Sequence, residues 1–141
     1  MERRKIYFDT NIVLDMIDAS RHNHSRSVQM LKQLGLQKYQ MYISEDMLST
    51  IYYISKDKIS TLEFFENIIY IDWNILAFGT NVIKNATQEA LQKNLDFEDL
   101  LQCLCAKENN CQILITNDKE FHNCGLDVLS AKAFLKKFKT V

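Results

Sequence analysis

Five acidic side chains in three short segments are the residues of this chain best suited to chemistry. Asp9 lies near the N-terminus, Asp96 and Asp99 lie three residues apart, and Asp118 is followed by Glu120. Carboxylates repel one another when they are brought together, so a protein that converges them needs a cation. Oxygen ligands without His or Cys select hard ions such as Mg²⁺ or Mn²⁺. An ion held in this way suits phosphodiester hydrolysis, because it orients the phosphate, activates water and neutralises developing charge.

Each acidic segment also has a purely structural interpretation. Asp9 or Thr10 is a suitable N-cap for the helix that follows, and N-caps are far commoner than active sites. Asp96 and Asp99 lie at a predicted helix start, where both favour the positive end of the helix dipole. The residue types are therefore compatible both with a metal site and with helix capping. The arrangement of the helices and strands is needed to decide between the two.

Short apolar runs alternate with segments of helical spacing along the whole chain. Apolar, often β-branched runs predict strands, and apolar residues three and four apart predict helices. The first predicted strand ends at Phe8, and the others cover residues 40–43, 68–71, 111–115 and 126–129. The predicted helices start near Ile12 and cover 25–36, 45–56, 59–67, 80–92 and 97–107, with Ser44, Thr80 and Ser130 as caps and a last helix ending near Phe138.

This alternation predicts a parallel sheet with helices on both faces. In such a sheet the carboxyl ends of the strands share one edge, and ligands bind there. Two of the predicted strands are followed by acidic residues at that edge, since Asp9 follows Phe8 directly and Asp118 comes shortly after the strand that ends at Ile115. This coincidence is the main argument for a site.

The composition is that of an ordinary globular protein. The 141 residues suit a single domain, 1–141, with 47% hydrophobic and 25% charged residues. The net charge of −1 argues against a strongly basic nucleic-acid-binding protein, although a local basic patch remains open. We expect neither a secretion signal nor a membrane span, because the apolar runs are too short.

Four cysteines, at positions 103, 105, 111 and 124, form no C-x-x-C pair. Zinc and thioredoxin-like sites are therefore not indicated. We expect reduced thiols that serve as small buried apolar groups, which favours a cytoplasmic protein.

Three blocks of the chain resemble the signature segments of the PIN domain family. They are residues 8–15 (FDTNIVLD), residues 96–102 (DFEDLLQ) and residues 115–121 (ITNDKEF). Their order and spacing fit over nearly the whole chain. The resemblance implies a three-layer α/β/α sandwich around a mainly parallel sheet of four to five strands. It also implies Mg²⁺- or Mn²⁺-dependent cleavage of RNA. Many small bacterial members resemble VapC, the toxin of a type II toxin–antitoxin pair, and act as homodimers with an antitoxin as partner.

The resemblance also assigns roles to individual residues. Asp9, Asp99 and Asp118 match catalytic, metal-binding acids of the family, and Asp96 matches an auxiliary metal ligand. The supporting polar positions are Asn11, Thr50, Thr116, Asn117 and Glu120. One departure concerns the acid that the family carries in the helix after the second strand. At the position of this family acid the chain has Ser49 and Thr50, which are uncharged. The nearest acids, Glu45 and Asp46, lie about one helical turn before that position.

The missing acid motivates a second hypothesis, a catalytically degenerate PIN fold that binds RNA or protein. A third hypothesis, phosphoryl transfer through an aspartyl-phosphate at Asp9, lacks the second acid of the usual D-x-D start, because Asn11 stands there.

The sequence determines the substrate contacts poorly. Several basic residues are candidate phosphate contacts, although ordinary solvated surface is the favoured interpretation for any one of them. They are Arg3, Arg4, Lys5, Arg21, Arg26, Lys119, Lys132, Lys136, Lys137 and Lys139. The aromatic residues Tyr52, Tyr53, Phe64 and Phe65 suit either the core or a dimer face, and we expect core for most of them.

Overall fold

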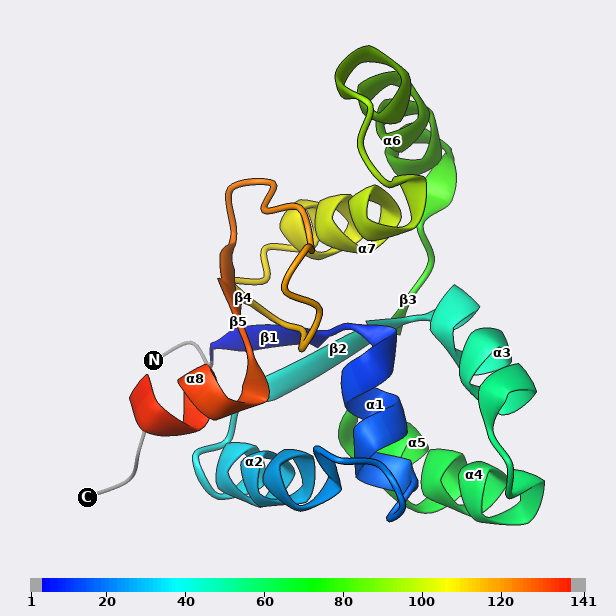
Figure 1. Cartoon of the computed structure of the whole chain (residues 1–141), viewed down its shortest axis with the longest axis vertical. Helices are drawn as coiled ribbons and strands as arrows, with labels where there is room; N and C mark the ends of the chain where they lie inside the picture. Colours follow the sequence, from blue (N-terminus) through cyan, green and yellow to red (C-terminus); the bar gives the residue numbers. More distant parts are fainter. Residues whose placement is uncertain (1–3, 138–141) are drawn as a thin grey trace.

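The computed structural model describes residues 4–137 and contains a five-stranded parallel sheet between two layers of helices (Figure 1). The strands lie in the order β3-β2-β1-β4-β5, and every neighbouring pair is parallel. They are β1 (Lys5–Phe8), β2 (Gln40–Ser44), β3 (Asn74–Leu76), β4 (Ile113–Ile115) and β5 (Asp127–Leu129). The α/β sandwich predicted from the alternating pattern is confirmed.

Helices cover both faces of this sheet. In Figure 1, α7 and the α6 helix packed on it lie on one side, and α1, α2, α4 and α5 lie on the other. The helices are α1 (Thr10–Ile17), α2 (His24–Leu36), α3 (Glu45–Ile54), α4 (Lys58–Phe64), α5 (Tyr70–Asp72), α6 (Gly79–Lys93), α7 (Phe97–Glu108) and α8 (Ala131–Lys137), with a π-helical turn, η1 (Phe65–Ile69), between α4 and α5. Among residues 4–137, none of the helices combines the length and apolar character needed to cross a bilayer.

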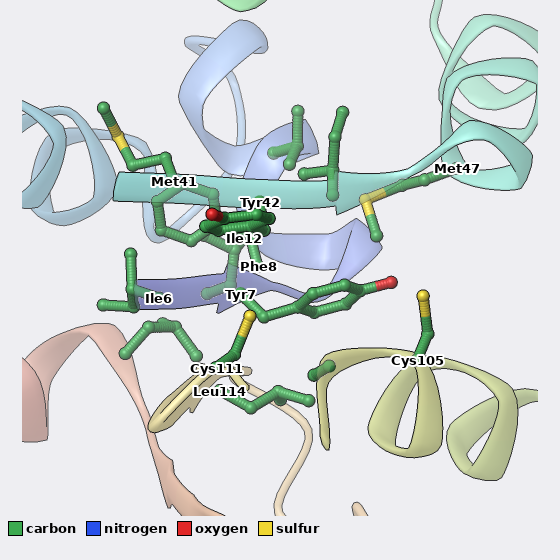
Figure 2. Close-up of a cluster of buried hydrophobic side chains, with 14 of the residues drawn as sticks. Ile6, Tyr7, Phe8, Ile12, Met41, Tyr42, Met47, Cys105, Cys111 and Leu114 are labelled. Atoms are coloured by element: carbon green, nitrogen blue, oxygen red, sulfur yellow. The ribbon is translucent and has the colours of Figure 1, made fainter. Parts of the chain in front are cut away.

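The central strand β1 is fully buried beyond its first residue. Ile6, Tyr7 and Phe8 are inaccessible to solvent, as expected for a strand with helices on both sides. In Figure 2 the ring of Tyr7 extends toward Cys105 on α7. Its hydroxyl donates to Oε1 of Gln102, which also accepts from Ser44 Oγ at 3.2 Å. The buried amide of Gln102 thus ties α7 to the ends of β1 and β2.

The strand predicted at residues 68–71 is wrong. This segment is helical, and the strand that pairs with β2 is Asn74–Leu76. Phe65, Ile69 and Trp73 are buried at four-residue spacing, whereas Ile71 is 76% exposed. The period of four, rather than the β-branched composition, decides the structure of this segment, because it places three large side chains on one helical face.

Two smaller expectations also need correction. Thr80 does not cap α6, because the chain enters this helix one residue earlier, at Gly79, where φ is +79°. Of the aromatic cluster, Phe65 is in the core and Phe64 is partly buried, but Tyr52 and Tyr53 are exposed. The caps predicted at Ser44 and Ser130 are confirmed. Phe138, the predicted end of the last helix, lies outside the described residues.

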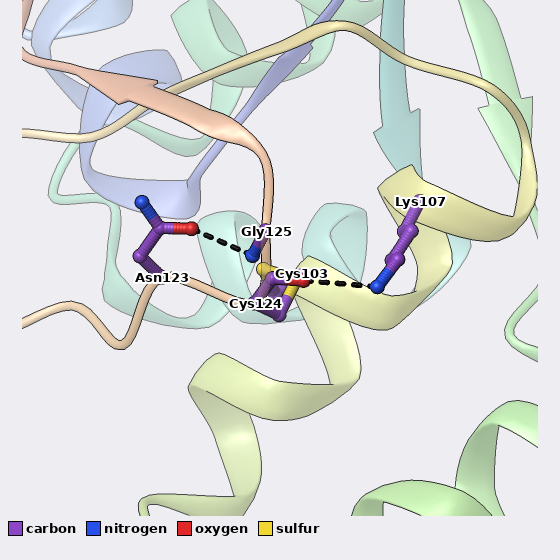
Figure 3. The surroundings of a disulfide bond; sticks show 5 residues. All are labelled: Cys103, Lys107, Asn123, Cys124 and Gly125. Carbon is purple, nitrogen blue, oxygen red and sulfur yellow. Dashed lines mark hydrogen bonds between the residues drawn. A yellow bond between two sulfur atoms is a disulfide. The ribbon is translucent and has the colours of Figure 1, made fainter.

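The expectation of four reduced thiols is wrong for one pair. Cys103 of α7 and Cys124 of the loop after β4 form a disulfide (Figure 3). The carbonyl of Cys124 also accepts from Nζ of Lys107 at 3.1 Å. The two cysteines are 21 residues apart, and only the packing of the loop on α7 brings them together. Cys105 and Cys111 are free and buried, as expected.

Thiol labelling tests this pairing. Burial raises the pKa of Cys105 to about 11 and that of Cys111 to about 12, so both thiols should resist alkylation in the folded protein. We expect iodoacetamide to label none of the four cysteines before reduction. After mild reduction it should label the partly exposed Cys124. Peptide mass spectrometry reads out the positions, and labelling of Cys124 without reduction would contradict the disulfide.

Candidate functional site

Asp9 lies at the carboxyl end of the central strand and begins the first helix. Its backbone N–H donates to the carbonyl of Ile115 at 2.9 Å, so it ends β1 beside the end of β4. Its Oδ1 accepts from the N–H of Thr10 at 2.8 Å, which makes it the N-cap of α1. The N-cap interpretation of Asp9 is therefore confirmed. It does not exclude a role as a metal ligand, because capping uses only one of the two carboxylate oxygens.

That second oxygen is held by two polar side chains. Asp9 Oδ2 accepts from Thr116 Oγ1 at 2.8 Å and from Asn11 Nδ2 at 3.0 Å. Asn11 Nδ2 also lies 3.1 Å from Thr116 Oγ1. Burial raises the pKa of Asp9, the negative charge of Asp118 adds to this, and the donated hydrogen bonds oppose it. The geometry fits the orienting role that the resemblance implies for Asn11 and Thr116.

Asn117 extends this network to the far end of α1. Its N–H donates to Asn11 Oδ1 at 3.1 Å, and its Nδ2 donates to Asp15 Oδ2 at 3.0 Å. Its own Oδ1 accepts from the N–H of Ala131, at the start of α8, at 3.3 Å. Asp15 is buried and pairs with Arg21 Nε at 2.7 Å. Asp15 had no assigned role in the sequence, although an acid on the apolar face of a helix signals a buried partner.

Helix α7 supplies the next two acids. Asp96 caps it, because Asp96 Oδ1 accepts from the N–H of Asp99 at 2.9 Å. Burial, followed by the charges of Asp96, Asp9 and Asp118, raises the pKa of Asp99 to about 6, against a hydrogen bond from the backbone of His122. The three acids predicted from separate segments therefore lie close enough to interact electrostatically.

Asp118 lies in the loop after β4. Its N–H donates to Thr116 Oγ1 at 3.1 Å, and Thr116 Oγ1 in turn donates to Asp9 Oδ2, so one hydroxyl links the two acids. Its Oδ1 accepts from the N–H of Glu120 at 2.9 Å. The side chains of Asp118 and Glu120 are exposed. The described contact of Glu120 is thus through its backbone and not through its carboxylate.

The region of the missing family acid holds Glu98, which sequence reasoning passed over, and Asp46, which it placed about a turn too early to match the family acid. Thr50 Oγ1 donates to the carbonyl of Asp46 at 3.3 Å within α3. Glu98, on α7, has a pKa raised by burial first and then by the charge of Asp46, with further contributions from Asp96 and Asp9. Asp46 and Glu98 thus extend the negative charge of the site toward α3. Adjacency to Asp99 was the available signal for Glu98.

The donor set fits a hard divalent cation. Among residues 4–137, no three His, Cys, Asp or Glu side chains are grouped closely enough to hold a metal ion as they stand. Burial nevertheless raises the pKa of both Asp9 and Asp99, and the negative charge of Asp118 adds to both shifts, which a cation would relieve. Aspartate oxygens are the ligands that Mg²⁺ and Mn²⁺ prefer.

Comparison with known families agrees with this arrangement. The profile of the PIN domain family matches residues 6–125. The chain belongs to the PIN domain family. This PIN domain is 32% identical over 145 residues to Ribonuclease VapC1 of Aquifex aeolicus (strain VF5), and the match covers the full length of both chains. The family resemblance drawn from the three sequence blocks is confirmed.

Solved structures share the fold of this PIN domain. VapBC2 of Rickettsia felis, bound to a DNA fragment from its promoter, is 22% identical with a TM-score of 0.67, covering 88% of this chain and 96% of the other. VapC20 of Mycobacterium tuberculosis, described as a sarcin–ricin loop cleaving toxin, is 13% identical with a TM-score of 0.69, covering 86% and 95%. FitAcB of Neisseria gonorrhoeae is 18% identical with a TM-score of 0.68, covering 90% and 98%.

The burial of Asp99 and the charges of the acids around it predict a pH-dependent stability for the metal-free PIN domain. The folded-state pKa of Asp99, about 6, lies above its ordinary value of 3.8, so the folded state binds this proton more tightly. The contribution of Asp99 to the free energy of unfolding is therefore fully present below about pH 4 and is lost as the pH rises through about 6. In EDTA at pH 7 we expect Asp99→Asn to raise Tm by about 2 °C.

Thermal unfolding in EDTA from pH 4 to pH 7 measures this effect. Asp72→Asn, which neutralises an exposed acid on α5, is the matched control and should leave the pH dependence unchanged. An Asp99→Asn protein with the wild-type pH dependence would contradict the charge coupling at this site.

Proposed function

We propose that this PIN domain is a ribonuclease that hydrolyses RNA phosphodiester bonds with Mg²⁺ or Mn²⁺. One observation carries the proposal, the convergence of Asp9, Asp99 and Asp118 from β1, α7 and the β4 loop. Thr116 Oγ1 donates to Asp9 Oδ2 and accepts from the N–H of Asp118, and the charges of both acids add to the raised pKa of Asp99. The curated relative named a ribonuclease, matched along its full length, supports the same activity. We further propose that the protein is the toxin of a toxin–antitoxin pair, by analogy with the VapC20 toxin that shares its fold. We also propose that it acts as a homodimer, as the family resemblance implies.

In this proposal the three acids hold the ion and Asp96 assists. When bound, the ion supplies positive charge beside the scissile phosphate and Lewis acidity. Thr116 and Asn11 fix Asp9 Oδ2 through donated hydrogen bonds, and Asp96 fixes the first turn of α7, on which Asp99 lies. The protein's part is therefore to keep charged oxygens in position before the substrate arrives, which lowers the cost of reorganisation during the reaction.

Cleavage of a mixed panel of RNAs in Mg²⁺, Mn²⁺ or EDTA tests the activity. We expect cleavage with either ion and none in EDTA. A thermal melt with and without Mn²⁺ accompanies the assay, because a ligand that binds the folded state raises Tm. Absence of cleavage together with an unchanged Tm in Mn²⁺ would replace this proposal with the degenerate binding module, which the uncharged Thr50 favours.

The same departure provides a gain-of-function prediction. If Thr50 occupies the position of the family acid, Thr50→Glu adds a charged ligand to the site. We expect the substitution to tighten Mn²⁺ binding roughly tenfold, because affinity for hard cations rises with the number of charged ligands. Isothermal titration with Mn²⁺ measures the change.

Ser49→Glu is the control for this substitution, since it adds the same charge one residue away, at an exposed position of the same helix. Equal affinities in the two variants would show that the effect is one of net charge and that Thr50 does not lie in the register of the missing acid.

A further inference from the structure

A basic groove runs between α2 and α8, away from the carboxylates. It has a volume of about 520 Å³ and includes Arg26, Gln29 and Gln33 of α2 and Lys132 and Lys136 of α8 among its lining. We call it the α2–α8 groove. The three residues from α2 are three and four positions apart, and the two lysines of α8 are four apart. Residues at these spacings share one face of a helix, so each helix presents a polar face to the groove.

This groove is continuous with the candidate active site. A neighbouring hollow of about 690 Å³ is lined by Thr116, Asn117 and Asp118, and it shares His22, Arg26 and Lys132 with the groove. A chain that passes Asp118 can therefore continue into the α2–α8 groove along these shared residues. The other side of the site, toward α3, is acidic, because Asp46 and Glu98 lie there.

The charges of the groove are all of one sign. Arg26, Lys132 and Lys136 carry positive charge, and none of the described residues that line the groove is acidic. The ion pairs among residues 4–137 join Arg21 to Asp15 and Lys137 to Asp127. The three groove cations are therefore not neutralised by carboxylates of the described chain. A net charge of −1 makes such a concentration of positive charge notable.

We propose that the α2–α8 groove binds the phosphates of single-stranded RNA on one side of the bond that is cut, an inference that rests on the proposed ribonuclease function. Arg26, Lys132 and Lys136 contact phosphates, and Gln29 donates to sugar or base atoms. A hollow of about 520 Å³ has room for a short stretch of one strand and not for a duplex. The described lining of the groove contains no Phe, Tyr or Trp, and His22 is its one ring on which a base could stack, so phosphates carry most of the affinity.

Fluorescence anisotropy with a labelled 12-nucleotide single-stranded RNA tests the groove. The measurement is made in EDTA with the whole protein, so binding is recorded without cleavage. The test variants are Lys132→Gln/Lys136→Gln and Arg26→Gln. The matched control is Lys84→Gln/Lys93→Gln, which removes two exposed lysines from α6. All four lysines are on the surface, and circular dichroism checks that each variant folds.

We expect the double groove variant to bind the RNA roughly tenfold more weakly at moderate salt. Its slope of log affinity against log salt should flatten by about 0.7 for each lost phosphate contact. The α6 control should bind as the wild type does. RNA that does not bind the wild-type protein, or that loses equal affinity in the two double variants, would overturn the proposal.

An acidic peptide is the competing ligand for a basic groove. Titration of labelled hexaglutamate with the same variants therefore runs in parallel. Groove-dependent binding of the peptide without groove-dependent binding of RNA would overturn the proposal. Because binding is read in EDTA, a failure of the groove is distinguishable from a failure of the ribonuclease assignment, which only the cleavage assay measures.

Discussion

Asp9→Asn is expected to abolish RNA cleavage and to leave the fold intact. The substitution removes the charge at the centre of the site and replaces one carboxylate oxygen with an amide. Asp9 Oδ2 accepts from Thr116 and Asn11, and the carbonyl oxygen of asparagine can keep these two contacts while the charge is lost. We expect a loss of about 10³-fold or more in kcat, the scale seen when one preorganised electrostatic contact is removed.

The stability of this variant should not fall in parallel. Burial raises the pKa of Asp9, which means that the charged form is already unfavourable in the folded protein. Replacing it with a neutral amide removes that cost. Tm in EDTA should therefore equal or exceed the wild-type value, and circular dichroism should be unchanged.

Asp127→Asn is the matched control for activity. Asp127 is an exposed acid on β5 that pairs with Lys137, and the substitution makes the same change of charge outside the site. Its kcat should equal that of the wild type. Wild-type cleavage by Asp9→Asn would remove Asp9 from the catalytic set and leave the proposed mechanism without its central ligand.

Asp15→Ala is expected to destabilise the protein by about 2 kcal/mol, the scale of losing the hydrogen bonds of a buried charged acceptor. Asp15 accepts from Arg21 and from Asn117, and it is only 3% exposed. Alanine leaves the amide of Asn117 without its acceptor on α1. Since Asn117 also anchors the first turn of α8, the loss should loosen the loop that carries Asp118.

Urea unfolding measures this loss, with Asp72→Ala as the control for removing an acid from an exposed helical position. Asp15→Asn should be intermediate, because its single carbonyl oxygen can accept from one of the two donors. Asp15→Ala and Asn117→Ala should be less than additive in the double variant, since both break the same contact. Equal stability of Asp15→Ala and Asp72→Ala would contradict the network.

The site was predictable from sequence where it follows from the ends of strands. Asp9 and Asp118 come directly after β1 and shortly after β4, and parallel strands bring their carboxyl ends to one edge. Asp99 was predictable from the family resemblance and from its position in the first turn of a helix. The Asp15 network was not, because its partners join α1 to a loop 102 residues later.

The fold was predictable except where local composition conflicted with packing. Ile68, Ile69 and Ile71 favour a strand by composition, yet Phe65, Ile69 and Trp73 pack as one helical face. The disulfide could not be predicted for a related reason. Four cysteines permit several pairings, and only the path of the loop over α7 selects Cys103 and Cys124.

The parallel order of the sheet has a consequence for the newly made chain. The contact between Thr116 and Asp9 spans 107 residues, and β1 acquires its second neighbour only when β4 is present. A ribosome releases residues 9 and 99 well before residue 118, so a nascent chain carries two of the three acids without the strand that aligns them. Contacts of this range form late in folding. An RNA-cleaving chain with this topology would remain inactive during most of its own translation, and truncation before β4 would leave no partial enzyme.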